Sequence, residues 1–222
     1  MRRGPRLALL VIGWGVLTGH VFSGCRDLFT PAVPEPPTGQ SIVLNYRSPE
    51  ATLNTMEAGI VAKGRGSQAW LGGFADSTQP SETPAYHQFF DSGDVGLFEA
   101  ACGCEAPPDW RASQEQNFFQ AFIEVRPSDD YVLVLEPRAE QPDPQPGATQ
   151  IVLYRQYQVL ATAPDGNSTL IIATGLADLT FTLRGSDWLI TRWDDHVNPD
   201  VGVNPSDPYQ VSLGRRRLES TR

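Results

Sequence analysis

Three long runs of alternating side chains, joined by two short turns, constrain this chain more than any other feature. The runs cover residues 150–163, 168–183 and 187–193. The turns contain glycine and small polar residues, which adopt the positive φ angles that tight hairpins need. They read Pro164-Asp165-Gly166-Asn167 and Arg184-Gly185-Ser186-Asp187. Consecutive runs of this kind predict an antiparallel meander in the second half of the chain.

The first run indicates how the sheet is covered, because alternate residues of a strand point to opposite faces. Neither face is wholly apolar, so we expect one face to be covered and the other to be partly exposed to water. One face is predicted to carry Val152, Tyr154, Gln156, Gln158 and Leu160, and the other Leu153, Arg155, Tyr157 and Val159.

The first half of the chain carries helix signals. Ser48-Pro49-Glu50 combines a capping residue, a proline suited to the first position and an acid that complements the helix dipole. It predicts a helix over 48–64, with Leu53, Met56, Ile60 and Val61 on its apolar face. Further helices are predicted over 67–74 and 110–122, short strands over 86–90 and 131–136, and a loop over 96–107.

Residues 1–24 have the pattern of an export signal. Three arginines precede an apolar run from Leu7 to Phe22, the arrangement typical of a secretory signal peptide. A membrane-spanning helix needs about 20 apolar residues. This run is shorter and contains His20 and several glycines, so a retained membrane span is the weaker alternative.

The end of that run, Val21-Phe22-Ser23-Gly24-Cys25, resembles the processing box of bacterial lipoproteins. The resemblance implies that Cys25 becomes the first residue of the mature chain and carries the lipid, although Phe22 replaces the usual Leu. Because Arg26 rather than Asp follows the cysteine, it also implies the outer membrane, facing the periplasm. The alternative is an ordinary signal peptide with a chance cysteine.

Charge narrows the range of partners. The chain has 17 Lys and Arg against 26 Asp and Glu, a net charge of −9, which argues against a nucleic-acid partner. Removal of residues 1–24 would leave a still more acidic body, which a membrane would hold through the lipid and not through its surface charge. The proline-rich segment 25–44 is predicted to be a tether. A domain over 45–197 and an extension over 198–222 follow, and Arg215-Arg216-Arg217 is predicted to be a solvated terminus.

Two helices, a short strand, a third helix and long antiparallel strands form an α+β order. The stretches that carry it are 48–64, 70–76, 110–122 and 188–195. They resemble the nuclear transport factor 2-like (cystatin-like) superfamily, in which helices pack into a curved sheet to form a cone. The resemblance implies this fold and a dimer through the open sheet face. Because the superfamily includes enzymes, ligand binders and non-catalytic domains, the fold does not fix the function. A lipocalin-like barrel is the alternative, which the helical first half disfavours.

Cys102-Gly103-Cys104 is the first candidate for chemistry. The pair predicts a structural disulfide, a reactive disulfide in a strained small ring, or a soft-metal site completed by His87. The neighbouring acids Glu99 and Glu105 would raise the pKa of the thiols and weaken their reactivity. A closed zinc site needs four ligands, and the sequence has no second cysteine pair. The structural disulfide is therefore favoured.

Acid–base chemistry is the second candidate. Enzymes of the resembling superfamily use an Asp or a His–Asp pair inside the cone, which would point here to His87 or to Asp194-Asp195-His196. Adjacent strand residues point to opposite faces, so a solvated strand end is favoured, and no catalytic residue of the family matches a position here. A pocket for an apolar ligand would be lined by His87, Trp70, Trp110, Tyr154, Trp188 and Trp193, although such aromatic residues are more often core.

These observations predict a lipid-anchored envelope protein with a non-catalytic interaction or small-ligand-binding domain. We expect no cofactor, and we expect a protein partner in the envelope and a homodimer. The alternatives are an isomerase- or hydrolase-type enzyme with a His/Asp pocket, and a thiol or metal protein that uses Cys102 and Cys104.

Overall fold

The structure, a computed structural model, describes residues 41–76, 85–144, 149–199 and 211–222. Apart from Ser41, these residues belong to one compact unit, Ile42–Arg222. The predicted signal peptide, Cys25 and most of the tether lie outside the described residues. Within those four ranges, no helix is long and apolar enough to cross a membrane.

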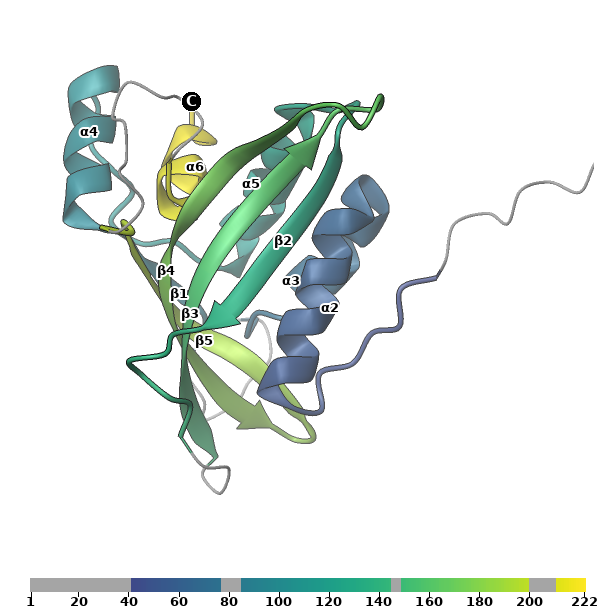
Figure 1. Cartoon of the computed structure of the whole chain (residues 1–222). Helices are drawn as coiled ribbons and strands as arrows, with labels where there is room; N and C mark the ends of the chain where they lie inside the picture. The colour runs from purple at the N-terminus through teal and green to yellow at the C-terminus, as the bar shows by residue number, and fades with distance from the viewer. Residues whose placement is uncertain (1–40, 77–84, 145–148, 200–210) are drawn as a thin grey trace, which may run out of the picture. The chain divides into compact units, whose positions relative to one another are not determined.

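A five-stranded mixed sheet organises the unit (Figure 1). Its spatial order is β1-β5-β4-β3-β2, in which β1 runs parallel to β5 and the other neighbours are antiparallel. The strands are β1 (His87–Phe89), β2 (Asp130–Pro137), β3 (Gln150–Thr162), β4 (Thr169–Arg184) and β5 (Asp187–His196). The predicted meander is confirmed, including its turns, where Gly166 and Gly185 have φ angles of 69° and 61°.

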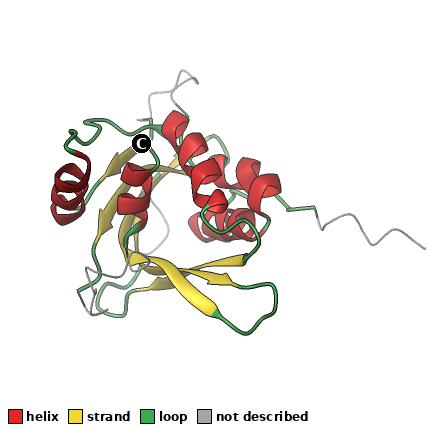
Figure 2. Ribbon diagram, turned by 90° about the horizontal axis from the view of Figure 1, so that it is seen from above, coloured by secondary structure: helices red, strands yellow, loops and turns green. Residues whose placement is uncertain are grey.

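The longest strands bend. The pairing of β3 with β4 shifts its register between Val159 and Leu160, and the pairing of β4 with β5 shifts between Thr180 and Phe181. An irregularity of this kind bends a strand and increases its twist. The strands therefore curve along one side of the helices (Figure 2).

Helices cover the inner face of the sheet, and three of them come before its long strands. They are α2 (Pro49–Val61), α3 (Ser67–Leu71) and α5 (Ala112–Glu124), with the 3₁₀ turn η1 (Lys63–Gly66) between the first two. One apolar core joins Met56, Trp70 and Phe118 of these helices to Leu153 and Leu179 of the sheet. The helices and the curved sheet give the unit the α+β, nuclear transport factor 2-like arrangement that the sequence predicted.

The local signals of α2 work as expected. The Ser48 hydroxyl accepts a hydrogen bond from the Ala51 amide at 3.1 Å, and Pro49 occupies the first turn. Leu53, Met56 and Ile60 are buried, but the prediction is wrong for Val61, which is 55% exposed. On β3 the predicted division of the two faces is confirmed, because Leu153, Arg155, Tyr157 and Val159 are buried while their neighbours are only partly so.

The predicted loop over 96–107 is wrong in its first half, which belongs to the helix α4 (Ser92–Cys102). The Asp91 side chain caps this helix by accepting a hydrogen bond from the Gly93 amide at 2.7 Å. Gly93 and Gly96 concealed the helix, because glycine weakens helices. Gly103, with a φ of 66°, ends it in the left-handed conformation.

The prediction that Arg215-Arg216-Arg217, in the extension over 198–222, is a solvated terminus is also wrong, because Arg217 is fully buried and the other two are only partly exposed. The described residues at the end of this extension form α6 (Leu213–Glu219), which packs against α4, α5, β4 and β5 (Figure 1). Leu213, Arg217 and Leu218 are buried, so α6 is part of the core.

Two glycines with opposite surroundings test the crossing of α2 with η1. A Cβ atom on Gly66 would lie 1.8 Å from the Gly59 carbonyl oxygen, whereas one on Gly96 of α4 would meet nothing within 4 Å. We expect Gly66→Ala to lower the free energy of unfolding by about 1–3 kcal/mol, and Gly96→Ala to raise it by about 0.5–1 kcal/mol. Urea unfolding of both variants measures the difference, and equal effects would contradict this account of the crossing.

Candidate functional site

A buried carboxylate stands at the centre of the space between the sheet and the helices. Glu115, in the first turn of α5, is fully buried. It accepts hydrogen bonds from Arg217 Nε at 2.7 Å, Trp110 Nε1 at 2.8 Å and the Tyr86 hydroxyl at 3.1 Å, with longer contacts from Trp70 Nε1 and Arg217 Nη2. Burial of a charge is costly unless it is paired and hydrogen-bonded, and Glu115 is both.

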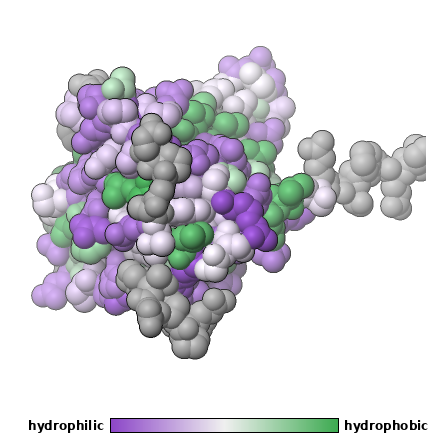
Figure 3. Space-filling model, turned by 90° about the horizontal axis from the view of Figure 1, so that it is seen from below, coloured by the Kyte–Doolittle hydropathy of each residue, from purple (hydrophilic) through white to green (hydrophobic). Residues whose placement is uncertain are grey.

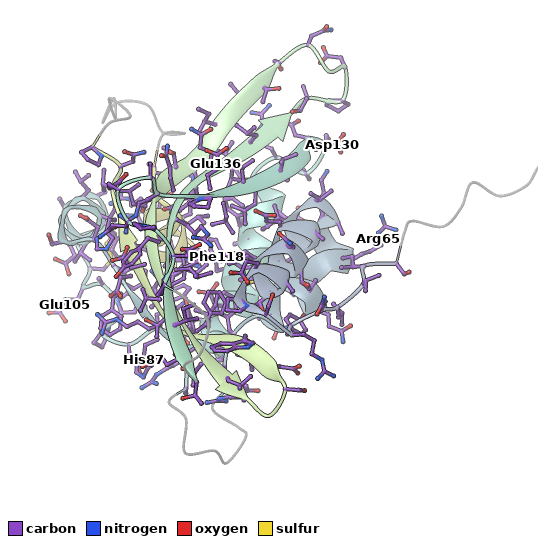
Figure 4. The ribbon with its side chains drawn as sticks, turned by 60° about the horizontal axis from the view of Figure 1, so that its bottom comes forward. Arg65, His87, Glu105, Phe118, Asp130 and Glu136 are labelled. Carbon is purple, nitrogen blue, oxygen red and sulfur yellow. A yellow bond between two sulfur atoms is a disulfide. The ribbon has the colours of Figure 1, made fainter. Side chains whose placement is uncertain are left out.

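The counter-ion comes from α6. The guanidinium of Arg217 is fully buried and lies over two aromatic rings, with its central carbon 4.4 Å from the ring centroid of Trp193 and 5.0 Å from that of Phe118. Phe118 points into the space between the sheet and the helices in Figure 4. All these partners belong to α5 or β5, so Arg217 connects the last helix to both layers.

A second carboxylate, Asp195 of β5, lies beside this pair. Its Oδ1 accepts a hydrogen bond from the Tyr157 hydroxyl at 2.6 Å, and that hydroxyl accepts one from the Leu213 amide at 2.8 Å. Its Oδ2 lies 3.8 Å from Arg217 Nη1, and neither atom has a hydrogen-bond partner among the described residues. We refer to the residues joined here as the interior cluster: Trp70, Tyr86, Trp110, Glu115, Tyr157, Trp193, Asp195 and Arg217.

Contacts at its start hold α6 over the interior cluster. The Ser212 hydroxyl accepts from the Arg215 amide and donates to Asp94 Oδ2 of α4, while Arg215 Nη1 donates to the Asp94 carbonyl. Gly214 permits the approach to β5, because a Cβ atom there would lie 2.8 Å from Asp195 Oδ2. The chain therefore needs a glycine at this position for the helix to reach Asp195.

Burial sets the acid–base properties of the interior cluster. It raises the pKa of Asp195 to about 7, against the opposing effects of Arg217 and the Tyr157 hydrogen bond. Burial, together with Glu115, raises the pKa of Tyr86 well above its ordinary value, and burial with Asp195 does the same for Tyr157. Burial disfavours the charge of Arg217, but Glu115, Tyr86 and Asp195 outweigh it and raise its pKa. Arg217 is therefore a permanent cation, whereas Asp195 can exchange a proton near neutral pH.

The elevated pKa of Asp195 predicts a pH-dependent stability. The folded protein holds this proton up to about pH 7, whereas the unfolded chain loses it near pH 4. The contribution of Asp195 to the free energy of unfolding is therefore complete below pH 4 and is lost as the pH rises towards 7. We expect the Tm of the wild type, relative to that of Asp195→Asn, to fall between pH 5 and pH 8. A constant difference across that range would contradict the assignment.

Glu115→Gln tests the central ion pair. The substitution removes the hydrogen-bonded counter-ion of the buried Arg217 guanidinium and leaves only Asp195 Oδ2, 3.8 Å from Nη1, which costs about 3–5 kcal/mol. Glu219→Gln is the matched control, because Glu219 pairs with Arg215 and Arg216 at a partly exposed position, where a loss of about 0–1 kcal/mol is expected. Urea unfolding of both variants measures the two losses in the free energy of unfolding. Equal losses would show that the buried pair contributes no more than an exposed one.

The structure divides the residues predicted to line a pocket. Trp70, Trp110 and Trp193 belong to the interior cluster, where they are packed as core. Trp188 packs against the margin of the core. Tyr154 lies on the outer face of the sheet, with the Arg138 guanidinium 5.2 Å from its ring.

His87 is placed apart from the interior cluster, on the edge strand β1 (Figure 4). Its side chain is 36% exposed, its Nδ1 lies 3.1 Å from Asp109 Oδ1, and its Nε2 contacts the Arg111 guanidinium. His87 therefore belongs to a polar cluster at the surface, with Asp109 and Arg111, and not to an enclosed pocket.

The predicted solvated strand end, Asp194-Asp195-His196, is wrong for its middle residue. Asp195 points inward and is buried, whereas Asp194 and His196 lie on the outer face with Arg192 and Asp178 as partners. The alternation of strand residues separates the three, as the sequence predicted.

Cys102 and Cys104 form a disulfide at the end of α4. It closes a loop of three residues, which contributes about 1.5 kcal/mol in the chain-entropy treatment and joins no separate elements. His87 is not brought to it as a third ligand. Among the described ranges, no group of three or more His, Cys, Asp or Glu side chains is placed to hold a metal ion.

Sequence reasoning missed Glu115, Arg217 and Tyr86. Glu115 belongs to the polar positions of α5, which an amphipathic pattern assigns to solvent, and Arg217 belongs to a run of arginines that looks like a solvated tail. One signal was available, because Leu213, Arg217 and Leu218 are spaced to share one face of a helix. An arginine between two leucines on one face indicates a buried partner of opposite charge.

No family model and no curated protein matches this sequence. Several solved structures resemble it. A protein of unknown function from Mycobacterium tuberculosis is 12% identical over 77% of this chain and 85% of its own, with a TM-score of 0.49. A cystatin-like domain from Nostoc punctiforme is 8% identical over 67% and 74%, with a TM-score of 0.42. A nuclear transport factor 2-like superfamily protein from Salmonella enterica is 13% identical over 69% and 90%, with a TM-score of 0.41. Each is similar to this chain only in the course of its backbone.

Proposed function

We propose that this chain is a lipid-anchored protein of the bacterial cell envelope, and that its nuclear transport factor 2-like domain is a non-catalytic binding module. The proposed location rests on three features of the sequence, which are three arginines, an apolar run and two small residues before Cys25. Arg26 favours the outer membrane, with the domain in the periplasm. The acidic charge keeps the domain away from an anionic membrane surface.

One observation carries the functional part of the proposal. The interior, where the enzymes of this fold hold their substrates, is occupied by the chain's own Arg217. Its charge is matched by Glu115, and the surrounding tryptophan rings are in the core. A substrate would have to displace a paired, fully buried guanidinium before it could reach Glu115 or Asp195.

The outer surface suits recognition of another protein. The face seen from below is mainly hydrophilic, with small separate hydrophobic patches (Figure 3). Phe89 on β1 is 44% exposed, and the Arg192 guanidinium lies 4.0 Å from its ring. Exposed aromatic and arginine side chains are the types that carry binding energy in protein interfaces. We propose an envelope protein as the partner, and a second copy of the chain as an alternative that uses the sheet.

Lipidation is tested with the full chain in a diderm bacterium. We expect the wild type to incorporate labelled palmitate and to fractionate with the outer membrane. Cys25→Ser is expected to lose the label and to leave the outer-membrane fraction, because the thiol that carries the lipid is absent. The Cys102→Ser, Cys104→Ser double variant is the control and keeps both properties. A labelled Cys25→Ser variant, or an unlabelled wild type, would exclude lipidation at this residue.

An enzyme is the second candidate, and one observation favours it. Asp195 has a pKa of about 7 and lies 2.6 Å from the Tyr157 hydroxyl, so a group able to move a proton near neutral pH is present. The exchange of the α-hydrogens of a small ketone in D₂O distinguishes an enzyme from a non-catalytic module. Exchange that is accelerated by the wild type and lost in Asp195→Asn would favour the enzyme. We expect no acceleration, because Arg217 fills the interior.

A further inference from the structure

Arg217 makes its interior contacts as a bound ligand does. None of the partners of its guanidinium belongs to its own helix: Glu115 and Phe118 come from α5, and Trp193 and Asp195 come from β5. A flat cation in contact with two rings, with a carboxylate at its edge, combines cation–π attraction with charge-assisted hydrogen bonds. The surroundings of Arg217 are therefore those of a receptor for a guanidinium group.

The fit of Arg217 to these surroundings is incomplete. Its Nε and Nη2 reach Glu115, but Nη1 has no hydrogen-bond partner and stops 3.8 Å from Asp195 Oδ2. Asp195 Oδ2, itself buried, also lacks a hydrogen bond of good geometry among the described residues, although the Gly214 amide lies close enough to the carboxyl to lower its pKa. The guanidinium of Arg217 is attached to α6 through its side chain, so it cannot take up every position that a free ion could. A free guanidinium has no such restraint and can donate to both carboxylates.

The same geometry discriminates between cations. Two carboxylates at the edge of a flat slot match the planar fork of a guanidinium, which is weakly hydrated and stacks on aromatic rings. An ammonium ion is compact and strongly hydrated, so it would leave the rings of Trp193 and Phe118 without a stacking partner. The slot is therefore expected to prefer guanidinium compounds to amines of the same charge.

We propose that the interior of this domain is a binding site for guanidinium compounds, and that Arg217 of the chain's own α6 fills it. Glu115 and Asp195 supply the acceptors, Trp193 and Phe118 the walls, and the Tyr157 hydroxyl fixes Asp195 in place. The inference goes beyond the proposed function and is independent of the anchor, because it concerns only residues of the folded unit.

Arg217→Ala in the full chain tests the proposal, with methylguanidinium as the probe. The variant removes the resident guanidinium and leaves its slot open. We expect 20 mM methylguanidinium to raise the Tm of the variant by about 4 °C, the shift for a ligand with a Kd of about 1 mM on a domain of this size. It should also change the fluorescence of the tryptophans beside the slot. The wild type, whose slot is filled, should show neither effect.

Three controls make the outcome specific. Arg217→Met fills the slot with an apolar chain of similar length and should not respond. The double variant Arg217→Ala, Glu115→Gln lacks the main acceptor and should respond at least fivefold more weakly. Methylammonium at the same concentration should shift the Tm of Arg217→Ala by less than a third as much as methylguanidinium.

Each contrary result overturns the proposal. A folded Arg217→Ala that does not respond to methylguanidinium would leave a structural ion pair and no ligand site. An Arg217→Ala that stays unfolded at every methylguanidinium concentration, while Arg217→Met folds, would have the same meaning. An equal response to methylammonium would show a general cation effect. None of these results bears on whether Cys25 is lipidated.

Discussion

The burial of one negative charge governs the architecture of this domain. Glu115 lies in the core among tryptophans, where an unpaired carboxylate would be far too costly. Its neutralisation requires a cation from another element, and Arg217 of α6 supplies it. Because of this requirement, a helix of seven residues that would be unstable alone becomes part of the core. The indole and phenol donors that point at Glu115 then fix how α3, α5 and β1 meet.

Close backbone approaches make this polar interior possible. Gly214 lets α6 come up to Asp195, and on the other side of Tyr157 a Cβ atom on Gly175 would lie 2.3 Å from the tyrosine hydroxyl. The two glycines thus leave room for a hydroxyl that connects β3, β5 and α6. On the outer face of the sheet the arrangement differs, because the largely covered Arg138 and the exposed Arg192 each pair with a partly exposed carboxylate. Among the described residues, the interior cluster is therefore more completely enclosed than these pairs, in which at least one side chain reaches the surface.

Local chemistry in the sequence predicted the meander, its two turns and the start of α2, because glycine at positive φ and a serine cap act within a few residues. The aromatic set offered as a pocket or as core is divided by the structure, which places Trp70, Trp110 and Trp193 in the core and Tyr154 on the outer face. Local chemistry did not predict α4, whose glycines resemble a loop, or α6, whose arginines resemble a solvated tail. A charged side chain is expected at the surface unless a partner of opposite charge is known. For Glu115 that partner, Arg217, lies 102 residues away in the sequence. No periodicity within one segment contains that information.

The distance of 102 residues between Glu115 and Arg217 along the chain has a consequence for the order in which the domain can assemble. As the chain emerges, whether from the ribosome or from the export machinery, α5 and all five strands precede Arg217, so Glu115 stays hydrated until α6 is available. While Glu115 is hydrated, the tryptophans around it cannot pack closely. Bringing Arg217 to Glu115 closes a long loop, which costs entropy before any contact is gained. Distant contacts of this kind slow folding. The last helix would then act as the final step of assembly, and the tryptophans around Glu115 would report in real time when the interior becomes dry.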